Sequence, residues 1–140
     1  MIKKIDEKRA SNKTLNGSKH ILMIDDDQAC LMSVEMLLFN TDFTLISALG
    51  GKEGLKYLLT YPKIDLILLD LMMPEINGLA LLEIIKQDAY LRKIPVILQT
   101  GVMSGDEVEK AYALGIVSVL KKPYTQPMLL HEIARALGQP

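Results

Sequence analysis

Short apolar runs alternate with amphipathic stretches along most of the chain. The apolar runs are strand-sized and span residues 20–24, 43–48, 64–69, 95–100 and 116–120. The stretches that follow them have helical length and helical spacing of their apolar positions, and they span residues 27–39, 51–60, 77–88, 105–114 and 125–137. Five strands alternating with five helices predict an α/β fold in which helices cover both faces of a parallel sheet.

Capping residues indicate where several of these helices begin and end. Ser104 and Glu107 form a Ser-x-x-Glu capping box, which predicts a helix start at this point. Asn77 and Thr125 are suited to cap the third and fifth helices. Gly115 follows the fourth helix, where a glycine commonly ends one. We therefore expect helix boundaries close to these residues.

Composition indicates one folded domain that is preceded by a polar arm. The 140 residues suffice for a single core, and 49% of them are hydrophobic and 24% charged, as in globular proteins. Residues 1–18 are polar and basic without sustained periodicity, so we expect a flexible basic arm there and one domain over residues 19–140. The net charge of −1 gives no support for direct binding to nucleic acid or to an anionic membrane.

Cysteine content and hydropathy bear on the compartment. Cys30 is the only cysteine, which excludes an intrachain disulfide and a cysteine-rich metal site and suits a reducing compartment. No segment approaches the roughly 18 uninterrupted apolar residues of a membrane span. The N-terminus also lacks the apolar stretch of a secretory signal. We expect a cytoplasmic protein without membrane insertion.

Asp70 is the residue that packing explains least well. It ends the apolar run at residues 64–69 and is followed by Leu71 and Met72. A strand of this kind is covered by helices on both faces, so a carboxylate at its end must reach a cleft, a metal or a proton. Open α/β sheets have their clefts at the C-terminal ends of the strands. Asp70 is therefore the leading candidate for a functional residue.

Three more acids end the first predicted strand, at Asp25, Asp26 and Asp27. The first and third strands are neighbours in a doubly wound sheet, so Asp25 and Asp26 should converge with Asp70. Asp27 is better explained as the N-cap of the first helix. A cluster of carboxylates either takes up protons or binds a hard cation, and Mg²⁺ prefers such oxygen ligands.

A hydroxyl group and an ammonium group complete this set. Thr100 ends the fourth apolar run and Lys122 follows the fifth, so both should lie at the same edge as the acids. A phosphoryl group on Asp70 would use all of them, because Mg²⁺ and Lys122 would neutralise its charge and Thr100 would bind one oxygen. His20 and His131 have no partner motif, and we interpret them as ordinary residues.

Four motifs resemble those of the receiver domains of two-component response regulators. They are Ile21–Asp27, Asp65–Pro74, Pro95–Thr100 and Lys122–Tyr124. The intervals are 44 residues from Asp26 to Asp70, 30 from there to Thr100 and 22 from there to Lys122. The resemblance covers about residues 19–138. It implies a doubly wound, flavodoxin-like (βα)5 fold, whose five-stranded parallel sheet has the order 2-1-3-4-5 and helices on both faces.

The resemblance also implies a role for each candidate residue. Asp70 resembles the phosphoacceptor, with Thr100 as the switch hydroxyl and Lys122 as the phosphate-binding lysine. The implied Mg²⁺ ligands are Asp25, Asp26, Asp70 and the backbone carbonyl of Met72. Of the acidic pair, Asp26 is the expected direct ligand. The implied reaction is in-line attack of the Asp70 carboxylate on phosphorus, followed later by hydrolysis of the acyl phosphate.

The family receives its phosphoryl group from other proteins, and this implies partners. We expect a sensor histidine kinase or a histidine phosphotransfer protein as the donor, an unidentified protein as the downstream target, and a monomer or a phosphorylation-dependent dimer. The chain ends at Pro140, shortly after the fifth helix, so we expect no output domain. The protein would then signal by switching the face of residues 104–124, and it would catalyse only its own phosphorylation and dephosphorylation.

Two departures from the family pattern affect the expected signalling. Val119 lies three residues before the lysine, where the family usually has an aromatic residue. Coupling of Thr100 to the rotation of an aromatic ring is therefore in doubt. Met72 and Val102 flank the expected path of the hydrolytic water. Their apolar side chains predict slow self-dephosphorylation.

The residues are less consistent with two other classes of function. A hydrolase with an aspartyl-phosphate intermediate would need a general acid or base near Asp70 and a cap over the substrate. Leu71 and Met72 follow Asp70 instead, and no cap is inserted. A receiver-like scaffold that works without phosphorylation would not need the complete set of acids together with Thr100 and Lys122.

Overall fold

Five strands form one parallel sheet within residues 18–101 and 105–138, the part of the chain that the computed structural model describes. They are β1 (Lys19–Asp25), β2 (Phe43–Leu49), β3 (Leu66–Asp70), β4 (Val96–Thr100) and β5 (Ser118–Lys121). Their order across the sheet is β2-β1-β3-β4-β5, which confirms the predicted fold. Apart from Ser18, the expected basic arm lies outside the described residues.

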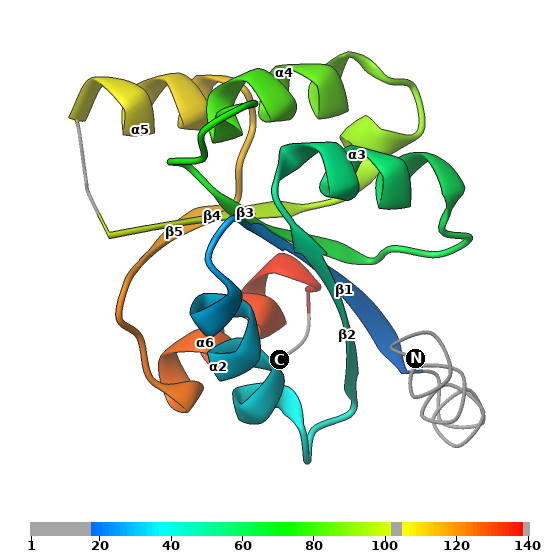
Figure 1. Ribbon diagram of the computed structural model, residues 1–140, viewed down its shortest axis with the longest axis vertical. Coiled ribbons are helices and arrows are strands. Elements are labelled where there is room, and N and C mark those ends of the chain that lie inside the picture. The colour runs from blue at the N-terminus through cyan, green and yellow to red at the C-terminus, as the bar shows by residue number, and fades with distance from the viewer. Residues whose placement is uncertain (1–17, 102–104, 139–140) are drawn as a thin grey trace.

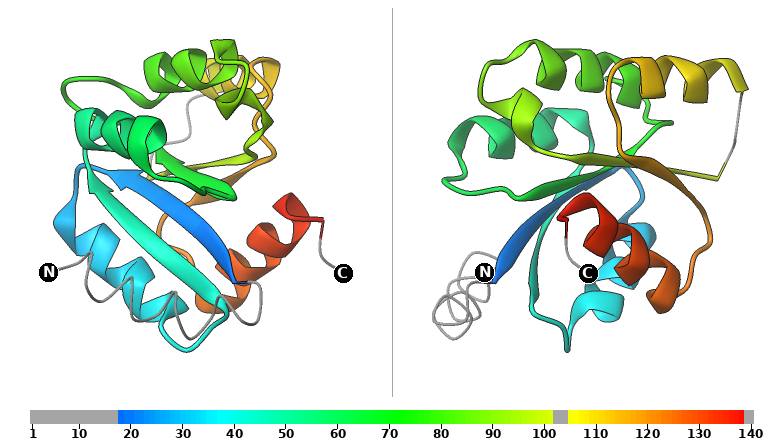
Figure 2. Two further views of the ribbon diagram at one scale, coloured as in Figure 1. Left: turned by 90° about the vertical axis from the view of Figure 1, so that its right-hand side faces the viewer. Right: turned by 180° about the vertical axis from the view of Figure 1, so that it is seen from behind.

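Helices cover both faces of this sheet, as Figure 1 and Figure 2 show. One layer holds α2 (Gln28–Leu38) and α6 (Gln126–Ala136). The other layer holds α3 (Gly51–Thr60), α4 (Gly78–Gln87) and α5 (Gly105–Ala113). Among the described helices, none has the length and apolar character that crossing a membrane requires. The doubly wound arrangement leaves the C-terminal edge of the strands open for a site.

The two-residue period of the strands divides the core into two halves. On β1, Ile21 and Met23 pack on the side of α2 and α6, whereas Leu22 and Ile24 pack on the side of the other three helices. β3 alternates in the same way. When the alternation is continued to the ends of β1 and β3, the two carboxylates there fall on the side of α2 and α6.

Three predicted helix caps are confirmed by hydrogen bonds. Asp27, Asn77 and Thr125 each accept a backbone N–H from the first helical turn, at 2.9, 2.8 and 3.4 Å respectively. Gly115, two residues after the end of α5, has a φ of +100°, a left-handed conformation that glycine adopts without strain. Ser104, the predicted cap of α5, lies outside the described residues.

Two strands begin two residues later than the apolar pattern predicts. Asp65 precedes β3, and its carboxylate accepts the backbone N–H of His20 at 2.7 Å. The Ile116 N–H donates to the carbonyl of Ala111 at 3.3 Å, so Ile116 belongs to the turn that ends α5. Both strands are thus shorter than predicted at their N-terminal ends, away from the expected site.

Candidate functional site

Three carboxylates converge at the C-terminal edge of the sheet, as predicted. Ile24 and Leu69 are paired in the register of β1 and β3, so the next residues, Asp25 and Asp70, lie side by side. One oxygen from each of Asp25, Asp26 and Asp70 lies within 4.8 Å of the others. Asp25 is fully buried and Asp70 is 5% exposed, whereas Asp26 faces solvent. The cluster is therefore closed on one side and open to water on the other.

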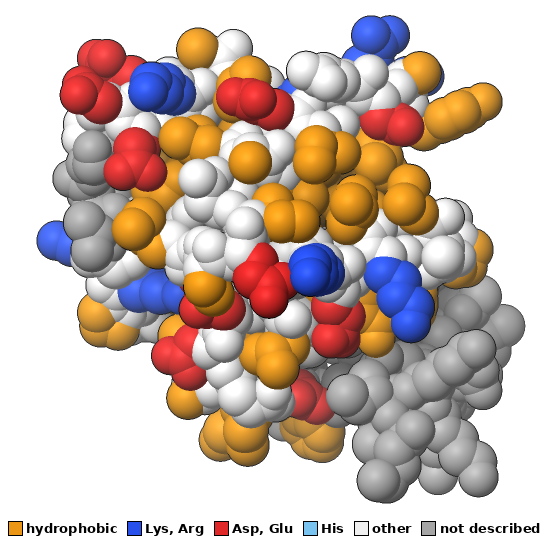
Figure 3. Space-filling view, turned by 45° about the horizontal axis from the view of Figure 1, so that its top comes forward, with side chains coloured by type: hydrophobic (Ala, Val, Ile, Leu, Met, Phe, Trp, Pro, Cys, Tyr) orange, Lys and Arg blue, Asp and Glu red, His pale blue; other side chains and the backbone are white. Residues whose placement is uncertain are grey.

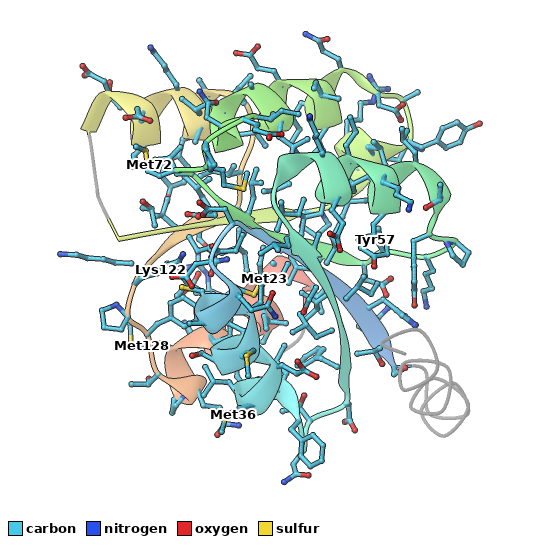
Figure 4. All side chains as sticks on the ribbon, viewed as in Figure 1. Met23, Met36, Tyr57, Met72, Lys122 and Met128 are labelled. Carbon is cyan, nitrogen blue, oxygen red and sulfur yellow. The ribbon has the colours of Figure 1, made fainter. Side chains whose placement is uncertain are left out.

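Lys122 supplies the positive charge of this cluster. Its Nζ lies 2.6 Å from Asp25 Oδ2 and 3.6 Å from Asp70 Oδ1. Figure 4 shows Lys122 toward the same end of the sheet as Met72, which lies in the loop after β3. Burial lowers the pKa of Lys122, but the hydrogen bond and the charge of Asp25 outweigh burial and raise this pKa. The lysine is therefore a stable cation between two acids.

Thr100 ends β4 next to the cluster and is fully buried. Its backbone carbonyl accepts the Lys122 N–H at 2.8 Å, which ties the predicted hydroxyl residue to the predicted ammonium residue. Val96 and Leu98 pack on the side of α3, α4 and α5, and alternation gives Thr100 the same side. The contact of its hydroxyl with a phosphoryl oxygen stays a prediction.

The loop after Asp70 is held closely against the first turn of α4. The Gly78 N–H donates to the Leu71 carbonyl at 2.9 Å. A Cβ atom at position 78 would lie only 2.4 Å from the Asp70 carbonyl oxygen, so this close approach requires glycine. Met72 lies in the loop with its side chain 55% exposed, and its backbone forms a hydrogen bond to the Asp70 carboxylate.

The surroundings of Asp70 disfavour its charged form more than the one nearby lysine can offset. Burial, and then the charge of Asp25, raise its pKa from the ordinary 3.8 to about 7, although Lys122 and the Met72 backbone act in the opposite direction. A divalent cation would remove this imbalance. The donor set fits Mg²⁺, because it consists of carboxylate oxygens and Asp26 opens to the water that Mg²⁺ retains in its shell.

The raised pKa of Asp70 predicts a pH-dependent stability for the metal-free protein. Between about pH 4 and pH 7 the unfolded chain ionises at Asp70 while the folded chain keeps the proton, so the free energy of unfolding falls as pH rises. We expect Asp70→Asn to stabilise the metal-free protein at pH 8 by about 2 kcal/mol more than at pH 4. Urea denaturation at both pH values measures this difference. Equal stabilisation by Asp70→Asn at the two pH values would contradict the raised pKa of Asp70. Excess Mg²⁺ should reduce the difference between the two pH values.

Sequence reasoning does not identify two further residues of the site, Gln99 and Tyr124. Gln99 pairs with Asp70 in the register of β3 and β4, and its Nε2 donates to Asp25 Oδ2 at 3.5 Å. The Tyr124 hydroxyl donates to Gln99 Oε1. A signal was present in the sequence, because an amide at residue 99 interrupts an apolar strand just as a carboxylate does at residue 70.

Comparison of the chain with known proteins identifies one family. Residues 21–134 match the family described as response regulator receiver domain. The polar-differentiation response regulator DivK of Brucella ovis is 30% identical over 122 residues, which are 86% of this chain and 98% of that protein. A probable cyclic di-GMP phosphodiesterase of Vibrio cholerae is 35% identical over 111 residues, 78% of this chain, but the chain spans only 24% of that protein.

A solved structure shares the fold. The signal receiver domain of an HD domain-containing protein from Pseudomonas fluorescens is 28% identical and has a TM-score of 0.80. The match covers 86% of this chain and 95% of that structure. Almost the whole of that domain is therefore matched by the present fold.

Proposed function

Because the chain belongs to the family of response regulator receiver domains, we propose that it accepts a phosphoryl group on Asp70 from a phosphohistidine of a partner protein. The observation that carries this proposal is the contact of one ammonium group with two carboxylates. Lys122 Nζ lies 2.6 Å from buried Asp25 and 3.6 Å from Asp70. An arriving phosphoryl group can take the place of one of these acids as the partner of the lysine.

The chemistry proceeds at the Asp70 carboxylate. One of its oxygens attacks phosphorus in line, the O–P bond forms, the N–P bond of the phosphohistidine breaks, and the imidazole leaves with that electron pair. Bound Mg²⁺ supplies charge neutralisation for the phosphoryl oxygens, and Asp25, Asp26, Asp70 and the Met72 carbonyl would hold it. Lys122 binds a second phosphoryl oxygen, and the Thr100 hydroxyl donates to a third.

The partners follow from this chemistry. A sensor histidine kinase or histidine phosphotransfer protein donates the phosphoryl group, and a downstream protein reads the face of residues 104–124. On that face Tyr112 is 49% exposed, which makes it available to a partner, while Val119 packs partly against the core.

Charge gives no support for a nucleic-acid partner. In the view of Figure 3, acidic and basic side chains are interspersed, without a field of one charge that would suit nucleic acid.

Signalling, not turnover of a substrate, is the proposed role. A hydrolase would need an acid or base beside the nucleophile, yet the two residues that follow Asp70 are apolar, the buried Leu71 and the exposed Met72. A scaffold would not need a half-buried lysine between two acids, an arrangement that is costly to desolvate. The protein would thus catalyse only its own phosphorylation and dephosphorylation, in the cytoplasm where phosphohistidine donors act.

Incubation with a small phosphodonor or with beryllofluoride, with and without Mg²⁺, tests the proposed function. Modification that requires Mg²⁺ supports the receiver reaction. Absence of modification would favour the scaffold. Continuous turnover of diverse phosphoesters would favour the hydrolase.

Met72 predicts slow self-dephosphorylation. A thioether cannot hydrogen-bond the attacking water firmly, whereas an amide of similar length can orient it. We expect the phosphoryl group to persist for many minutes and Met72→Gln to shorten its half-life by about tenfold. Phosphate release from the phosphorylated protein measures the half-life. Met36→Gln, at an exposed position of α2, is the matched control and should leave the half-life unchanged.

A half-life of a few seconds for the unmodified protein would contradict this prediction. The second residue invoked, Val102, lies outside the described residues. Met72→Gln is therefore the variant that tests slow self-dephosphorylation, because the Met72 side chain is exposed next to β3, which ends at the phosphoacceptor.

A further inference from the structure

Gln99 is a buried polar side chain in a mainly apolar strand. It lies in β4 and is fully buried. Ile97, two residues earlier, packs with the core half beneath α2 and α6, and alternation gives Gln99 the same side. An aliphatic residue would pack there without any desolvation cost. A buried amide is stable only when both of its ends have partners.

The two ends of the Gln99 amide have different kinds of partner, a hydrogen-bond donor at Oε1 and an acceptor at Nε2. The Tyr124 hydroxyl donates to Oε1, and Nε2 donates to Asp25 Oδ2 at 3.5 Å. A carboxylate only accepts hydrogen bonds, so the NH₂ end of the amide must face Asp25. The carbonyl end then faces Tyr124. The amide therefore has one favourable orientation, which the tyrosine and the carboxylate fix together.

The carboxylate that Gln99 contacts belongs to the acidic pocket. Asp25 Oδ1 accepts the Asp27 backbone N–H at 2.9 Å, and Oδ2 accepts from both Gln99 and Lys122. When Lys122 turns to a phosphoryl group, Oδ2 keeps only the glutamine as a donor. Without that donor, a buried carboxylate would be held at one oxygen only.

We propose that Gln99 is a positioning residue whose amide, oriented by Tyr124, holds the Asp25 carboxylate in the geometry that binds Mg²⁺. This inference rests on the proposed function of the acidic pocket. Hydrogen bonds to metal-binding carboxylates orient these ligands, and their loss typically weakens metal binding by 10- to 100-fold. Tyr124 follows Lys122 and Pro123 and precedes α6, so the same hydrogen bonds connect the metal pocket to the loop between β5 and α6.

A double-mutant cycle on the full chain tests the inference. Isothermal titration calorimetry with Mg²⁺ alone measures the dissociation constant of the unmodified protein, Gln99→Met, Tyr124→Phe and the double variant. We expect Gln99→Met to raise it by about tenfold and Tyr124→Phe by about threefold. The double variant should match Gln99→Met, because Tyr124 acts through the amide. Tyr90→Phe, 84% exposed and remote, is the control and should bind Mg²⁺ normally.

Two results would overturn the inference. One is an unchanged dissociation constant for folded Gln99→Met, and the other is full additivity of the two substitutions, which indicates separate structural effects. If Gln99→Met does not fold, Tyr124→Phe decides: a normal dissociation constant together with an unchanged Gln99 side-chain amide resonance overturns the proposal. Absence of Mg²⁺ binding by the unmodified protein would instead remove the proposed function itself.

Discussion

The Asp70→Asn variant is expected to take up no phosphoryl group from a small phosphodonor in the presence of Mg²⁺. The amide has nearly the shape of the carboxylate but lacks its nucleophilic charge, so the O–P bond cannot form at a useful rate. We expect phosphorylation to fall by about 10³-fold or more, to the level of the background. Intact-protein mass spectrometry after a fixed incubation measures the modified fraction.

The control for this variant is Asp42→Asn, an exposed acid after α2 that lies outside the cluster. It should be phosphorylated as fast as the unmodified protein. Circular dichroism should show both variants folded, since the Asn side chain fits the space of Asp70. Rapid modification of folded Asp70→Asn would mean that another residue is the acceptor.

Removal of the Lys122 charge should have the second largest effect. Lys122→Met leaves Asp25 fully buried without its ion partner at 2.6 Å. Breaking a buried pair in this way costs about 3 kcal/mol, because the remaining charge is desolvated and unpaired. We also expect phosphorylation to slow by about 10²-fold, since the variant no longer neutralises the developing phosphoryl charge. Urea denaturation and phosphodonor kinetics measure these two effects.

The adjacent Lys121 offers a matched control. Its side chain is exposed, so Lys121→Met should change the free energy of unfolding by less than about 0.5 kcal/mol and leave phosphorylation intact. Equal stability of Lys122→Met and Lys121→Met would contradict the role of the ion pair with buried Asp25. Normal phosphorylation of Lys122→Met would contradict its role in binding the phosphoryl group.

The fold could be predicted because each element carries a local signal. Apolar runs of strand length, helical spacing and capping residues such as Asn77 and Thr125 all agree with the packed structure, so few other arrangements remain. The short 3₁₀ helix η2 (Leu91–Lys93) has no comparable signal. Asp88 stabilises it by accepting the N–H groups of Tyr90 and Leu91, a local hydrogen-bond pattern that apolar periodicity does not report.

The candidate site could be predicted only as far as sheet topology determines it. Residues that end neighbouring parallel strands meet at one edge, which brings Asp25 and Asp70 together. Topology does not tell which of two adjacent acids is buried, and here Asp25 is buried while Asp26 is exposed. Nor does it predict that Tyr124 pairs with the amide of Gln99, because side-chain hydrogen bonds depend on the loop path after β5.

Reduction by borohydride tests most directly the claim that Asp70 is the phosphoacceptor. Borohydride converts an aspartyl phosphate to homoserine but leaves free aspartate unchanged, so peptide sequencing by mass spectrometry identifies the acceptor. After incubation with a small phosphodonor, we expect homoserine at residue 70 in the presence of Mg²⁺ and aspartate there when Mg²⁺ is chelated. Homoserine at Asp25 or Asp26, or an unmodified residue 70 with Mg²⁺ present, would contradict the account.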